Sequence, residues 1–156
     1  MKLGDTVAIG NTAKIYLDHG KIFKVFNESL PITESLYEAN KQRIAYSYGL
    51  NVPKVLDVTE IDGKQAIIME YIKGRTIGDI ISENMDQAEH FMNVSIDIQR
   101  KIHMIIDDSL EPMSEKLRHQ IELTTNLDER HKSLLLQKLD SMTFENRLCH
   151  GDFHFF

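Results

Sequence analysis

The sequence contains a single cysteine, fewer basic than acidic residues, and no long apolar run. One cysteine cannot form a disulfide framework within the chain, and 156 residues of which 42% are hydrophobic can bury a core without one. The lone Cys149 indicates a reducing compartment or indifference to redox conditions. The net charge of −6 argues against a general nucleic-acid binder. Because neither a signal peptide nor a membrane-spanning run is found, we expect a cytoplasmic location and no membrane partner.

Three short strands joined by two turns are predicted near the N-terminus. Their segments are rich in apolar and β-branched residues and cover residues 6–9, 14–17 and 21–26. Strand side chains alternate between two faces, so Ile22, Lys24 and Phe26 share one face. Lys24 then lies between two apolar neighbours, and its charge needs a partner.

Glycine and proline are absent from residues 34–48, which predicts a helix. Thr33 is a plausible N-cap, and Gly49 suits the position just past the helix end. Helical spacing predicts a buried stripe made of Tyr37, Ile44 and Tyr48. Glu38 lies near the edge of that stripe and has two interpretations. It is either a solvated residue close to Lys41, or the partner of Lys24.

The rest of the chain predicts two more strands and then helices. Residues 51–59 and 66–72, on either side of Asp62-Gly63, are predicted as the fourth and fifth strands of one antiparallel sheet. Apolar residues at helical spacing and capping patterns, including a box from Asp86 to Glu89, then predict helices. They cover 76–81, a long segment after Asp86, 114–123 and 128–142, and strand-like residues 147–149 follow. The fold class is therefore α+β.

The segment His150-Gly151-Asp152 resembles the His-Gly-Asp-x-x-x-x-Asn loop of the aminoglycoside phosphotransferase and choline kinase family. The order of the preceding features resembles that family over nearly the whole chain: a glycine-containing turn, the strand lysine, the helix glutamate, Met69-Glu70-Tyr71-Ile72, and Ile102-His103. The resemblance implies a protein-kinase-like fold. Residues 1–72 would form the N-lobe, a five-stranded antiparallel sheet with one helix, and residues 73–156 a partial helical C-lobe.

The resemblance implies ATP-dependent transfer of the γ-phosphate to a small-molecule hydroxyl, with ATP and magnesium as cofactors. Lys24 would hold phosphates, Glu38 would orient Lys24, and the backbone around Glu70 to Ile72 would bind the adenine edge. The cofactor-binding candidates are Lys24, Glu38, Glu70, Tyr71, Ile72, Asn11 and Thr12. Asp152 would position and deprotonate the attacking hydroxyl, and His150 would support the loop.

Three departures from the family pattern affect these expectations. Gly10-Asn11-Thr12-Ala13 is not a G-x-G-x-x-G loop, which implies a looser cradle for the phosphates. Phe155 and Phe156 stand where the family commonly has proline and a small residue. The magnesium-binding Asn would be residue 157, so we expect metal ligands beyond residue 156 and an isolated chain that is inactive.

Other interpretations of the chain remain open. It could be a non-catalytic nucleotide-binding or interaction module, or an unrelated α+β binding protein with coincidental motifs. The phosphate acceptor is also open, although the acidic charge would suit a cationic molecule such as an aminoglycoside. Self-association through the partial C-lobe is a further expectation, because Phe153, Phe155 and Phe156 lie close together in the sequence.

Overall fold

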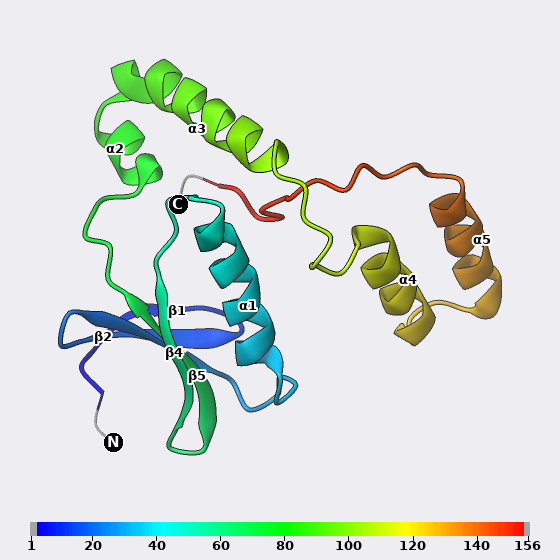
Figure 1. The fold of residues 1–156 in the computed structure, drawn as a ribbon, viewed down its shortest axis with the longest axis horizontal. Helices are drawn as coiled ribbons and strands as arrows, with labels where there is room; N and C mark the ends of the chain where they lie inside the picture. Colours follow the sequence, from blue (N-terminus) through cyan, green and yellow to red (C-terminus); the bar gives the residue numbers. More distant parts are fainter. Residues whose placement is uncertain (1–2, 155–156) are drawn as a thin grey trace. The chain divides into compact units, whose positions relative to one another are not determined.

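The computed structural model describes residues 3–154, and the chain divides into two compact units, Met1–Arg75 and Thr76–Phe156 (Figure 1). The first unit contains β1 (Asp5–Ile9), β2 (Ala13–Asp18), β3 (Lys21–Phe26), α1 (Glu34–Ser47), β4 (Val55–Ile61) and β5 (Lys64–Glu70). The second contains α2 (Ile77–Glu83), the 3-10 turn η1 (Met85–Gln87), α3 (Ala88–His103), α4 (Met113–Leu123) and α5 (Glu129–Asp140). The predicted α+β fold, a five-stranded antiparallel sheet with one helix followed by helices, is confirmed.

The strands of the sheet lie in the order β1-β2-β3-β5-β4, and every neighbouring pair is antiparallel. The predicted turn between β4 and β5 has positive φ at Asp62 (49°) and Gly63 (78°), as a two-residue hairpin turn requires. Both edge strands carry a register irregularity, between Thr6 and Ala8 in β1 and between Val55 and Asp57 in β4. The central strand, β3, places Lys24 opposite Ile15 of β2 and Ile67 of β5.

Each face of the sheet carries its own apolar cluster. The cluster that includes α1 consists of Ala13, Phe26, Ala39, Val55, Ile67 and Met69, with Ile22 packed against it. Phe23 and Val25 belong to the second cluster, which also contains Ile61 and Ala66. This alternation along β3 follows the two-residue period of a strand. It places Ile22 and Phe26, the predicted neighbours of Lys24, on the side of α1.

The predicted buried stripe of α1 was wrong for its two tyrosines, whereas its third member, Ile44, is half-buried. The residues that α1 buries are Ser35 and Ala39, whereas the side chains of Tyr37 and Tyr48 are 38% and 47% exposed. Small side chains let the helix backbone approach the sheet closely, and the bulky tyrosines are accommodated only on the outer side. Tyr37 there contacts a cation instead, with the Lys41 Nζ 3.7 Å from its ring centroid.

Of the two helix caps predicted in the second unit, one was confirmed and one was wrong. Thr76 caps α2 as expected, because its hydroxyl accepts a hydrogen bond from the Asp79 N–H at 3.0 Å. The capping box from Asp86 was wrong: Asn84 caps η1 by accepting from the Asp86 N–H at 3.1 Å, and α3 begins only at Ala88. Residues 147–149, predicted as strand-like, lie outside the described strands. The Leu148 N–H joins this segment to the residues just after α3 by donating a hydrogen bond to the Ile105 carbonyl.

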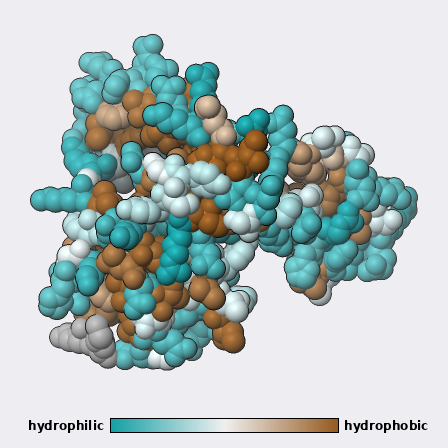
Figure 2. Space-filling model, viewed as in Figure 1, coloured by the Kyte–Doolittle hydropathy of each residue, from teal (hydrophilic) through white to brown (hydrophobic). Residues whose placement is uncertain are grey.

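The helices of the second unit are amphipathic, with Ile102 of α3 and Leu139 of α5 buried. Apolar residues of these helices are also exposed, among them Ile96, Ile98 and Leu135. Figure 2 shows hydrophobic surface between hydrophilic side chains on the face in view. Within residues 3–154 no helix combines the length and apolar character needed to cross a membrane. Self-association through residues 73–156 stays a prediction. Phe153 is half-buried, while Phe155 and Phe156 lie outside the described residues.

Asp128 makes the start of α5 sensitive to acid. Its pKa is lowered from the ordinary value of 3.8, chiefly because its carboxylate accepts hydrogen bonds from the His131 backbone N–H and ring. The stability that Asp128 contributes is therefore present above pH 3.8 and lost as the pH falls through the lower folded value.

Asp128→Asn is expected to reduce this acid sensitivity, because asparagine is an equally good N-cap but does not titrate. Circular dichroism between pH 5 and 2 checks the prediction. As the pH falls below about 4, the unfolding free energy of the wild type should decrease more than that of Asp128→Asn. Parallel acid curves would contradict it.

Candidate active site

Lys24 and Glu38 form an ion pair in the first unit, as the second interpretation of Glu38 predicted. The Lys24 side chain is 21% exposed and that of Glu38 33%. Lys24 rises from the central strand, and its Nζ also lies 5.2 Å from the ring centroid of Phe26. Glu38 reaches it from the sheet-facing side of α1. The pair thus holds a cation on the sheet, and the lysine side chain that carries it is partly exposed.

The turn between β1 and β2, which contains Asn11 and Thr12, is held by a residue that the sequence analysis did not select. The Asn27 side-chain amide donates to the Asn11 carbonyl at 2.8 Å, and the Asn27 backbone N–H donates to the Thr12 carbonyl at 2.8 Å. The Gly10 N–H closes the turn by donating to the Ala13 carbonyl at 2.9 Å. An asparagine directly after the lysine-bearing strand was the signal available in the sequence.

Within the described part of the chain, the backbone N–H groups are hydrogen-bonded up to Glu70, the last residue of β5, but not at the two residues that follow. The Glu70 N–H donates to the Lys54 carbonyl at 3.0 Å, and the Glu70 carboxylate accepts from the Lys54 N–H at 3.0 Å. Glu70 therefore has no backbone donor left for a ligand. The N–H groups of Tyr71 and Ile72 have no hydrogen-bond partner among residues 3–154, and both residues are exposed. These two residues offer the unpaired backbone groups that the edge of a planar heterocycle can bind.

The His150-Gly151-Asp152 segment lies in the second unit and forms a tight turn. Gly151 has φ of 82°, which favours glycine, and the Asp152 N–H donates to the Nδ1 of His150 at 3.3 Å. The His150 ring also meets the ring of Phe153 edge to face at 5.7 Å. The carboxylate of Asp152 is exposed, with the His154 Nε2 at 3.8 Å. A carboxylate presented in this way is accessible to a substrate hydroxyl.

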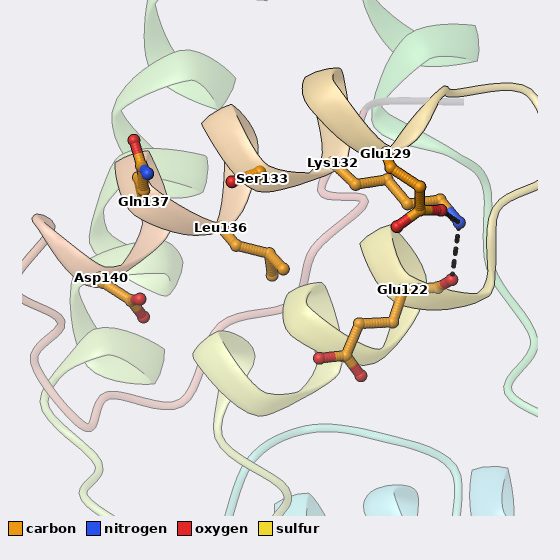
Figure 3. A pocket seen from close by; sticks show the side chains of 7 residues that line it. All are labelled: Glu122, Glu129, Lys132, Ser133, Leu136, Gln137 and Asp140. Atoms are coloured by element: carbon orange, nitrogen blue, oxygen red, sulfur yellow. Dashed lines mark hydrogen bonds and ion pairs between the residues drawn. The ribbon is translucent and has the colours of Figure 1, made fainter.

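A hollow of about 420 Å³ lies along α4 and α5 of the second unit (Figure 3). Its lining comes mainly from α5 and comprises Glu122, Glu129, Lys132, Ser133, Leu136, Gln137 and Asp140. Lys132 points across it towards α4, donating to the Glu122 carbonyl at 3.2 Å and pairing with Glu129 at 3.2 Å. Asp140 pairs with Arg118 of α4. The bonds of Lys132 and Asp140 thus tie α5 to α4.

Comparison with protein-family models gives a match to the phosphotransferase enzyme family, APH, over residues 6–156. The chain belongs to this family. A search of curated proteins found no match to this phosphotransferase domain. Among solved structures, it is similar to WbdD in its co-crystal structure with the kinase inhibitor LY294002, at 12% sequence identity and a TM-score of 0.39. That match covers 86% of this chain and 40% of the WbdD chain.

The phosphotransferase domain brings some of its predicted site residues together. Lys24 and Glu38 are in contact, and the turn at Asn11 and Thr12 is tied to the end of the same strand that carries Lys24. Asp152 and His150 contact each other in the second unit. Ile102 of the predicted Ile-His pair is buried, whereas His103 is exposed and does not pack into the core.

Proposed function

We propose that the chain forms the nucleotide-binding part of an ATP-dependent phosphotransferase that transfers the γ-phosphate to a hydroxyl group of a small molecule. The ion pair between Lys24 and Glu38 is the observation that supports this most strongly. In kinases, a glutamate on the helix presents a strand lysine to the α- and β-phosphates. Membership of the phosphotransferase family supports the same reaction class.

The described residues fit ATP at three places in the first unit. Lys24, whose side chain is partly exposed, offers its ammonium group for the phosphates, and the turn at Asn11 and Thr12 offers backbone close to the start of β2. The exposed N–H groups of Tyr71 and Ile72 would bind the adenine edge. Glu70 would contribute to adenine binding through its carbonyl alone, since its N–H donates a hydrogen bond to the Lys54 carbonyl. ATP supplies the phosphoryl group, and these residues bind and orient it.

Asp152 and His150 would act on the acceptor. Asp152 accepts the proton of the attacking hydroxyl, and His150 holds the turn through its bond with the Asp152 N–H. Within residues 3–154 no group of three His, Cys, Asp or Glu side chains is arranged to hold a metal ion, and we assign no magnesium ligand there. An acidic domain favours a cationic acceptor.

Non-catalytic nucleotide binding is the alternative function. It requires only Lys24, Glu38 and the backbone at Tyr71 and Ile72, all of which lie in the first unit. The two functions differ in whether Asp152 has a role, so binding and transfer must be measured separately.

The proposal is tested with the 156-residue chain by calorimetric titration with ATP and magnesium, beside a transfer assay with γ-labelled ATP on aminoglycosides and small alcohols. We expect weak saturable binding and no useful transfer, because the resemblance assigns a magnesium ligand to position 157. Absence of saturable ATP binding by the folded chain would overturn the proposal. Robust turnover that Asp152→Asn abolishes would instead show that the metal ligands lie within these residues.

A further inference from the structure

Gln65 of β5 makes two hydrogen bonds to the start of α1, a segment 30 or more residues earlier in the chain. Its side-chain carbonyl accepts from the Ser35 backbone N–H at 2.8 Å. Its amide group donates to the Pro31 carbonyl at 2.7 Å. Ser35 itself is only 4% exposed, so water has little access to this N–H. One side chain therefore satisfies both a donor and an acceptor at the entrance to the helix.

These bonds replace the local cap that the sequence predicted. The first N–H groups of a helix have no partner within the helix, and a side chain just before it normally supplies one. Here Thr33 occupies the N-cap position, but the acceptor for Ser35 comes from the sheet. A cap from another element fixes the helix end in space as well as ending it. The Gln65 amide cannot be reversed, because reversal would place donor against donor and acceptor against acceptor.

The capped end lies directly beside the ion pair. Glu38 follows Ser35 by three residues and therefore shares its face of α1. Gln65 precedes Ile67 by two residues on β5, and Ile67 is the register partner of Lys24. The two partners of the ion pair are thus connected through Ser35, Gln65 and the sheet ladder. Gln42, one turn after Glu38, anchors α1 a second time by donating to the Pro53 carbonyl.

We propose that Gln65 is a positioning residue that sets the place of α1 on the sheet so that Glu38 reaches Lys24. Without its bonds, the start of α1 is free to move away from β5, and Glu38 moves with it. The consequence for ATP rests on the proposed function, whereas the consequence for Lys24 does not.

The experiment compares wild type with Gln65→Leu, which has similar volume but neither hydrogen bond. The first readout is the acetylation rate of Lys24, measured by peptide mass spectrometry relative to exposed Lys14. Release from Glu38 should raise that rate about three- to tenfold, the range that corresponds to one lost hydrogen bond. The second readout is the ATP dissociation constant by calorimetry, which should rise by a similar factor.

Three further variants make the test specific. In a Glu38→Gln background, adding Gln65→Leu should change neither readout further, because the pair is already broken. Gln65→Glu keeps the acceptor for Ser35 and loses the donor to Pro31, so we expect a smaller rise in the acetylation rate of Lys24. This variant replaces Gln65→Leu in the test if Gln65→Leu does not fold. Lys64→Gln is the matched control. Lys64 lies next to Gln65 on β5, and its replacement removes an exposed ion pair with Glu28, which follows β3; the reactivity of Lys24 should not change.

An unchanged Lys24 rate in folded Gln65→Leu or Gln65→Glu would overturn the inference, as would an equal rise in Lys64→Gln. If Lys24 becomes more reactive while even the wild type binds no ATP, the positioning role stands and the proposed function fails. If ATP binds and its affinity falls with the Lys24 response, both stand.

Discussion

Lys24→Met is expected to raise the dissociation constant for ATP about tenfold to a hundredfold. Methionine keeps the length and the apolar stem of the side chain beside Phe26, but it has no charge to offer the phosphates. A hydrogen bond between charged groups is worth about 1.5–3 kcal/mol, which corresponds to that change in affinity. Calorimetric titration with ATP measures the effect at a temperature at which both proteins are folded.

Two controls separate the charge of Lys24 from general damage. Lys14→Met removes an exposed lysine from the neighbouring strand β2 and should leave ATP binding unchanged. Glu38→Gln should weaken binding less than Lys24→Met, because the ammonium group remains but is no longer held in place. If Lys24→Met binds ATP as the wild type does, the ion pair is structural and the proposed nucleotide site is wrong.

Ile67→Ala is expected to reduce the unfolding free energy of the first unit by about 2–5 kcal/mol. Ile67 is fully buried in the cluster between the sheet and α1, where Phe26 is 1% exposed. Truncation removes apolar contacts and leaves a cavity that the close-packed surroundings fill only in part. Urea unfolding followed by circular dichroism measures the loss as a lower midpoint.

The matched control for this prediction is Ile9→Ala. It makes the same change in the edge strand β1, where the side chain is 72% exposed, and the effect should stay within about 0.5 kcal/mol. Equal destabilisation by the two substitutions would contradict the placement of Ile67 in the core.

The sheet was predictable from the sequence because its signals are local. Alternation along residues 21–26 and the Asp62-Gly63 turn each depend on a few neighbouring residues, and both were confirmed. The buried face of α1 was not predictable by the same means. Periodicity analysis looks for large apolar residues, whereas the face that meets the sheet is made of Ser35 and Ala39.

The candidate site likewise has one part that could be predicted from the sequence and one that could not. The pairing of Lys24 with Glu38 could be anticipated, because the charge of a lysine in an apolar strand needs a partner and the family resemblance names one. The contact between Gln65 and Ser35 could not, since neither residue shows a local pattern and the two are joined only when the sheet and α1 pack. The same holds for Asn27 and the turn at Asn11.

The irregularities in β1 and β4 bear on how copies of the chain can meet. These are the two outer strands, and an outer strand with a regular backbone is a template for pairing with another molecule. In both strands the ladder slips by one residue, at Thr6 to Ala8 and at Val55 to Asp57, and such a bulge bends and twists the strand locally. A second chain approaching either outer strand would meet such a bend, which shortens the continuous row of donors and acceptors that it could extend.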